Sequence, residues 1–488
     1  MTYSPMAPAV LDRRPRPPLV SWAEPAWTAP HISLPVTLLA GLLAACTVPT
    51  DRPGLGWLVA GLVVAGAIRV VTRHRPTARP GAVSRIRWGI VTFALLTVPV
   101  LRAAPWLSVL CLATAVATGS LAVAGGRSLR ATLAGMVAVP VGALLGLPWL
   151  WASRRRSATA ERTFVAVVAS FAVLLVFGAL LAGGDAAFSV AIAAVMPRFS
   201  VAGIQSGVLI FVAAVLLVVG GCYTAAARPQ VRERDERKTV RALEWALPVG
   251  ALTLLYGGYV AVQVAVLFGG RDYVLRTSGL TAAQYARSGF WWLAIATALT
   301  LVVLGIAARL SAVDSVLDRV RRRLLLGPLA VLTLVIVASA LSRMWAYQEA
   351  YGFTVLRLLV EVCELWIGVV YVLVLIAGLG RGRAKWLPYT VIASAVAGLL
   401  AIAALDPERF VAERDVARYA ETGKIDTAYL ASLSADATPA LAALPASVRD
   451  CTLALQARHL RLDDGALDWN LGRSRAASYR MPTGFTCG

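Results

Sequence analysis

The sequence predicts an all-α integral membrane protein with about eleven transmembrane helices, one re-entrant or interfacial segment and a small helical extracytoplasmic C-terminal domain. Of its 488 residues, 58% are hydrophobic, and the mean hydropathy of +0.71 exceeds that of soluble domains. Apolar runs of about 20 residues, the length that a helix needs to cross a bilayer, recur along the chain. The net charge of +21 is concentrated in the short loops between these runs, which is typical of a multi-pass protein in a bilayer.

Residues 1–30 precede the first apolar run. They are rich in proline and carry Arg13, Arg14 and Arg16, without the short apolar core and small-residue cleavage site of a signal peptide. We expect a disordered cytoplasmic leader.

The polytopic domain is expected over residues 31–404. Each span is an apolar run long enough, or nearly long enough, to cross the hydrocarbon layer as a helix. The expected spans are 32–50, 54–71, 88–103, 105–124, 162–182, 205–224, 243–268, 289–308, 325–345, 356–379 and 387–404.

The apolar run 131–151 is ambiguous, because arginines flank it on both sides and Lys/Arg favour the cytoplasm. If it does not cross, the later cytoplasmic loops 225–241, 309–324 and 380–386 hold 14 Lys/Arg, against 4 in the opposite loops. We therefore predict a re-entrant or interfacial segment, and its glycines, Pro140 and Pro148 suit a broken helix. This assignment places the N-terminus in the cytoplasm and the C-terminus outside the cytoplasm. We expect the protein in the cell (inner) membrane.

The tail 405–488 has the composition of a small soluble helical domain. It holds 10 Lys/Arg and 11 Asp/Glu, unlike the basic remainder. Asp406-Pro407 predicts a helix start and Gly423 its end, followed by a hairpin of short helices. Cys451 and Cys487 would lie in an oxidising compartment, where they could pair.

Ionisable residues are rare inside the spans, and Glu361 and Glu364 lie well within one. At 100° per residue, Arg357, Glu361, Glu364 and Tyr371 share one face of this helix. A second stripe lies on span 243–268, and Arg343 can reach the same depth. The residues of the second stripe are Tyr256, Tyr259 and Gln263.

These stripes predict a polar pocket in the outer half of the membrane, with a glutamate pair offset by Arg357 and Arg343. Such a pocket suits transport or ion and proton coupling, since charged residues in a bilayer usually face protein or water. A buried ion-pair network that only fixes helix packing is the alternative structural interpretation. Two other functions stay open: a membrane enzyme on a lipid-linked substrate, with Asp51 or Glu361 as acid or base, and a signalling or scaffold protein whose outer tail binds an envelope partner.

Cofactor and nucleic-acid chemistry have no support in the sequence. The histidines are far apart, the cysteines lack metal-ligand spacing and phosphate-binding motifs are absent. We expect no cofactor, no metal and no nucleic acid, with the lipid bilayer as the main partner.

Several segments resemble a known family. They are "YVAVQVAVLFGG", "LTAAQYARSGFWWL", "YGFTVLRLLVEVCELW" and "GKIDTAYLASLSADATPAL". They are similar to signatures of bacterial polytopic membrane proteins grouped as domains of unknown function, of the 4153 or 4173 type. The resemblance covers about 240–445 well and the N-terminal half loosely. It implies that the fold continues from the spans into the tail, and it carries no reaction.

Overall fold

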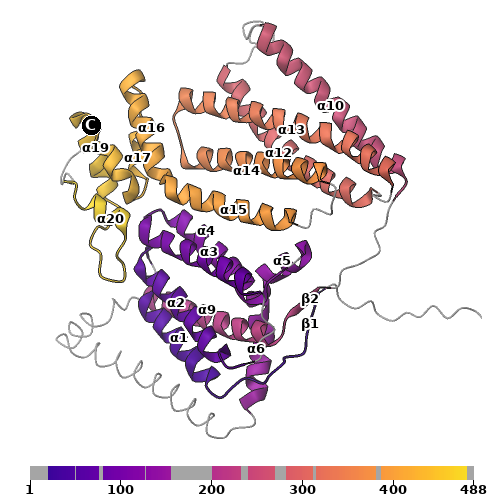
Figure 1. The fold of residues 1–488 in the computed structure, drawn as a ribbon. Coiled ribbons are helices and arrows are strands. Elements are labelled where there is room, and N and C mark those ends of the chain that lie inside the picture. Colours follow the sequence, from indigo (N-terminus) through magenta and orange to yellow (C-terminus); the bar gives the residue numbers. More distant parts are fainter. Residues whose placement is uncertain are drawn as a thin grey trace, which may run out of the picture.

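The computed structural model describes residues 20–49, 51–75, 81–126, 128–154, 201–231, 240–269, 282–311, 315–380 and 386–480. Two bundles of apolar helices lie side by side, and the tail covers one end of both (Figure 1). The prediction of an all-α multi-pass membrane protein is confirmed at this level.

The first bundle contains five long helices. They are α1 (Ser33–Thr47), α2 (Leu55–Thr72), α3 (Ala82–Leu101), α4 (Pro105–Ala124) and α9 (Val201–Ala226). Small residues let these helices approach closely, as membrane helices require. A Cβ on Gly41 of α1, for example, would lie 2.7 Å from a methyl of Val215 on α9.

The ambiguous run 131–151 forms a broken pair, α5 (Leu129–Met136) and α6 (Ala138–Arg154), bent by 60°. Both ends of α6 contact the same short part of α9. Thr224 donates to the Ala138 carbonyl (3.1 Å). The ring of Trp149 lies 5.8 Å from that of Tyr223, measured between centroids. The bend fits a broken span as well as a re-entrant segment, so the interfacial assignment stays a prediction.

The short strands β1 (Val20–Trp22) and β2 (Pro229–Val231) pair antiparallel, with Ser21 opposite Gln230. Trp27 follows β1 and is buried, and its carbonyl accepts a hydrogen bond from Trp149 Nε1 (3.1 Å). The expectation of disorder across 1–30 is therefore wrong for residues 20–30, because two aromatic side chains and a strand partner fix this segment. Residues 1–19 lie outside the described residues.

The second bundle contains α10 (Ala242–Gly269), α12 (Ala282–Leu310), α13 (Val316–Tyr351) and α14 (Val355–Leu379), with α15 (Leu387–Leu405) lying between the two bundles (Figure 1). A capping box formed by Ser315 and Asp318 fixes the start of α13, and the Thr354 hydroxyl caps α14. Both caps satisfy backbone N–H groups that a helix start leaves unpaired.

The tail is helical, as its composition predicted. Its elements are α16 (Pro407–Thr422), α17 (Thr427–Ala431), a 3₁₀ turn (Ala435–Ala437), α18 (Thr438–Leu441), α19 (Ala446–Ala457) and α20 (Leu471–Ala476). Helix α16 begins at Pro407 and ends before Gly423, whose φ of 68° is left-handed. The side chain of Asp406 does not cap the helix, however; it forms an ion pair with Arg102 instead.

Within the described ranges, nine helices are long and apolar enough to cross a membrane, or ten if the bent pair counts as one span. Helix α1 is apolar but has only 15 residues. The expected span 162–182 lies outside the described residues, so the total of eleven stays a prediction.

Candidate functional site

The predicted polar stripe lies on α14, whose first residue follows the turn after α13. At about 1.5 Å per residue, Glu361 lies roughly 9 Å and Glu364 roughly 14 Å along the helix from Val355. Both glutamates therefore lie in the first half of the 25-residue helix, on the side of the docked tail. Their depth in the outer half of the membrane stays a prediction.

Glu364 is 1% exposed, between α12 and α14. Thr297 of α12 lies against it, with its hydroxyl oxygen 3.1 Å from Glu364 Oε1 and 3.5 Å from Oε2. Among the described residues, Glu364 has no arginine or lysine at ion-pair distance. A buried carboxyl without a cation is costly as an anion, so its surroundings favour a bound proton or cation.

Glu361 is half-buried and lies one turn nearer the start of α14 than Glu364. Gln348 of α13 donates from Nε2 to Glu361 Oε2 at 2.9 Å. Gln348 is fully buried, and its Oε1 atom has no hydrogen-bond partner. This buried acceptor beside a carboxyl is the second unusual polar feature of the site.

The two arginines contact other groups than the glutamates. Arg357 donates to the Gly352 carbonyl at 2.6 Å, and its guanidinium lies 4.6 Å from the ring centroid of Tyr347. Arg343 donates to Tyr259 Oη at 3.5 Å. The expectation that both arginines offset the glutamate pair therefore finds no direct ion pair in the described part of the chain.

The remaining predicted residues form two groups. Tyr371 is fully buried and donates to the Thr297 carbonyl (2.7 Å), which joins it to the Glu364 group. Tyr256 bonds the Thr300 hydroxyl at 2.7 Å, one turn further along α12. Tyr259 accepts a hydrogen bond from Gln263 (2.8 Å) and the weaker one from Arg343, as a separate group.

Sequence reasoning missed three residues of the site: Thr297, Thr300 and Gln348. The two threonines are at i and i+3 on α12 and so share a face, and both are buried. A search restricted to charged residues and tyrosines overlooks them, although a pair of hydroxyls on one face of an apolar helix was a readable signal.

The tail docks on three turns of the membrane domain, and the first is the connection between α1 and α2. Arg52 pairs with Asp468 (3.0 Å) and approaches Asp464 (3.5 Å). The Leu55 and Gly56 amides donate to the carbonyls of Trp469 and Leu467. Asp51, weighed as a catalytic acid, is an exposed neighbour of Arg461 at 3.5 Å.

The second docking turn connects α3 and α4. Asp436 Oδ2 accepts hydrogen bonds from the backbone amides of Ala103 (2.7 Å) and Ala104 (3.3 Å). Asn470 Nδ2 donates to the carbonyls of Pro99 and Arg102, each at 2.9 Å. The tail therefore recognises this turn through its backbone.

The third docking turn connects α13 and α14, next to the Glu361 group. Asp415 of α16 accepts from the Phe353 amide at 2.8 Å, and Tyr429 accepts from the Val355 amide at 2.8 Å. Burial raises the pKa of Asp415. These three turns and the tail lie at one end of the bundles, and β1 and β2 lie away from that end (Figure 1). The relative sidedness agrees with the predicted topology, while the choice of inner and outer side stays a prediction.

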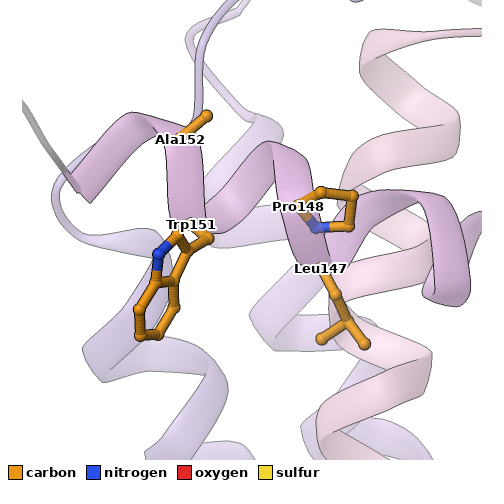
Figure 2. Close-up of a pocket in the computed structure, with 4 residues that line it drawn as sticks. All are labelled: Leu147, Pro148, Trp151 and Ala152. Carbon is orange, nitrogen blue, oxygen red and sulfur yellow. The ribbon is translucent and has the colours of Figure 1, made fainter.

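Two cavities are outside the Glu364 region. One is an open, mostly apolar hollow of about 540 Å³ on α6, where Leu147 and Trp151 project from the helix beside Pro148 (Figure 2). The other, of about 10 Å³, lies in the tail beside Asp406 and Asp436. Glu364 itself is almost fully buried in this conformation, and the water-open pocket expected around the two stripes stays a prediction.

Two further predictions concern cysteines and metals. Cys451 on α19 is disulfide-bonded, and its predicted partner Cys487 lies outside the described residues, so the identity of the partner stays a prediction. Across the part of the chain that the structure describes, no group of three or more His, Cys, Asp or Glu could hold a metal ion.

Comparison with known proteins gives one match. The model of a family described as "Domain of unknown function (DUF4153)" matches residues 89–444, which extends further towards the N-terminus than the segments that carry the resemblance in the sequence. No curated protein and no solved structure matches the chain.

Proposed function

From the premise that the chain belongs to the DUF4153 family of membrane proteins, whose function is unknown, we propose that it carries out ion- or proton-coupled transport, with Glu364 as the proton-binding residue. The observation that carries this proposal is the burial of Glu364 on an apolar helix of membrane-spanning length without a cation at ion-pair distance, as far as the described residues extend. Intramembrane carboxyls of this kind commonly serve proton relays and ion pathways.

The hydrogen bonds around Thr297 support a proton on Glu364. The Thr297 hydroxyl lies 2.9 Å from the Ala294 carbonyl and 3.1 Å from Glu364 Oε1, yet it has only one proton to donate. A protonated Glu364 serves both contacts, because its carboxyl then donates to Thr297 while the hydroxyl donates to Ala294. With an ionised Glu364, the hydroxyl could donate to only one of the two acceptors, although the Ala294 carbonyl would keep its backbone donor within α12.

Glu361 is a second member of the proposed site. It lies one helical turn from Glu364 towards the docked tail, and Gln348 holds one of its oxygens. The unpartnered Gln348 Oε1 is an acceptor that an arriving proton carrier, water or cation could use. Glu361 is therefore placed to pass a proton between the tail-covered end of the bundle and the buried Glu364.

Chemical labelling tests the proton site directly. A hydrophobic carbodiimide enters the bilayer and reacts with protonated carboxyl groups, so mass spectrometry of the labelled protein should identify Glu364. Labelling should fall as pH rises and should be absent in Glu364→Gln. Absence of labelling at low pH in the folded wild-type protein would contradict the proposal.

Complementation then tests the role of this site in the cell. Glu364→Gln keeps the shape of the side chain and should insert normally but fail to restore the phenotype of a knockout strain. Glu349→Gln is the matched control, since Glu349 is an exposed glutamate at the end of α13. Full activity of Glu364→Gln would leave helix packing as the role of the buried group.

A further inference from the structure

A small cavity lies where the tail meets the turn between α3 and α4. Its volume is about 10 Å³, which is room for roughly one water molecule. It is lined by Asp406, Arg409, Asp436, Pro439, Gly472 and Arg475. The cavity is separate from the Glu364 site, which lies between α12 and α14.

Two carboxyl oxygens at this cavity are buried and have no hydrogen-bond partner. They are Oδ1 of Asp436, a residue 4% exposed, and Oδ1 of Asp406, a residue 7% exposed. The other oxygen of each residue is used: Asp436 Oδ2 accepts from the Ala103 and Ala104 amides, and Asp406 Oδ2 pairs with Arg102. Ionised carboxyls are acceptors only, so neither free oxygen can satisfy the other.

Charges of both signs face Asp436. Asp406 and Glu408 repel its negative form, while Arg102, which is paired with Asp406, favours it. From the packed helices, Arg409 of α16 pairs with Glu413, and Arg473 of α20 pairs with Asp464; Arg475 lines the cavity. Burial, with repulsion from Asp406 as the next cause, raises the pKa of Asp436 to about 7.

We propose that Asp436 binds a proton on Oδ1 and donates it to Asp406 Oδ1 across this cavity, which makes the joint between the tail and the α3–α4 turn sensitive to pH. One proton converts two unpartnered acceptors into a donor and an acceptor. Loss of the proton places two negative charges side by side in a buried cavity and weakens the docking of the tail on this turn.

The direction of the effect follows from linkage. The pKa of Asp436 is about 7 in the docked state and is expected near its ordinary value of 3.8 when the tail is released into water. The docked state therefore holds more protons between these values, so docking is strongest below the lower pKa and weakens as pH rises towards about 7. Above the docked-state pKa, the contribution of Asp436 no longer changes.

Hydrogen exchange on the full-length protein in nanodiscs measures this docking at the Ala103 and Ala104 amides. After correction for intrinsic exchange, wild-type protection should fall by up to about tenfold per pH unit between about pH 4 and about pH 7, and then level off. Asp436→Asn should remove this slope. Asp450→Asn should keep it, because this half-buried aspartate of α19 does not line the cavity. Glu364→Gln should keep it too, which separates this proposal from the proposed function.

A second variant covers the case in which Asp436→Asn does not fold. Asp406→Asn removes the repulsion and offers an amide donor to Asp436 Oδ1, so the slope should shrink. A flat wild-type profile, or an unchanged slope in a folded Asp436→Asn protein, would overturn the proposal. Restoration of protection at high pH by calcium chloride would also overturn it, because the cavity would then hold a cation.

Discussion

Replacing Arg473 with methionine should substantially weaken the docking of the tail on the first docking turn. Its side chain is 5% exposed and pairs with Asp464 at 2.7 Å. It also donates to the Pro53 carbonyl at 2.8 Å and to the Asp468 carbonyl. Removing one partner of a buried ion pair costs about 3–5 kcal/mol.

Two features reduce the cost of this change. Arg52 stays 3.5 Å from Asp464, so the carboxylate keeps one cation. Methionine also fills part of the space left by the arginine. We therefore expect a loss of about 3 kcal/mol in the free energy of local opening, which is roughly a hundredfold faster exchange at equilibrium.

The assay is hydrogen exchange of the Leu55 and Gly56 amides, which donate to tail carbonyls. The matched control is Arg449→Met, because Arg449 is 39% exposed and its partner Asp450 32%. An exposed pair of this kind contributes about 0–1 kcal/mol. Equal small effects in both variants would refute the view that buried ion pairs hold the tail in place.

Three further predictions test other parts of the structure. Thr297→Val keeps the shape of the side chain but removes the hydroxyl beside Glu364, so we expect carbodiimide labelling of Glu364 to change while the helices stay folded. In thermal unfolding, Gly352→Ala should destabilise the protein by about 3 kcal/mol, because Gly352 has φ 87° and ψ 163°, a region almost reserved for glycine. Gly423→Ala should cost about 1 kcal/mol, because Gly423 has a left-handed conformation with open space around it. When whole cells are treated with an impermeant thiol reagent, Asp463→Cys in the tail should be labelled and Arg319→Cys at the start of α13 should not. The reverse pattern would invert the predicted topology.

Element positions were readable from the sequence because they depend on local physics. Apolar runs of bilayer length gave most spans, and the Pro407 and Gly423 signals gave the bounds of α16. The bent segment α5–α6 was anticipated from its flanking charges and prolines. The leader was misjudged because the strand that orders residues 20–22 pairs with residues 229–231, too far along the chain for a local pattern to reveal.

The docking of the tail was unreadable for a different reason. Its acceptors and donors meet backbone groups, such as the Ala103 amide and the Pro99 carbonyl, which every sequence possesses. The sequence identified Asp406 as a helix cap, but its ion pair with Arg102 required the fold. Side chains of the candidate site were more visible, since Glu364 and Tyr371 stand out in an apolar helix, yet their shared partner Thr297 did not.

The contacts of Glu364 limit how this residue can be reached by water. Both hydrogen-bond links around it, Thr297 with Glu364 and Tyr371 with the Thr297 carbonyl, cross between α12 and α14 of one bundle. Movement of one bundle against the other would leave these links intact. Separation of α12 from α14 would break both links and expose Glu364 to water. The tail holds the start of α14 through Asp415 and Tyr429, so this separation would move α12 away from a held α14 unless the tail is released.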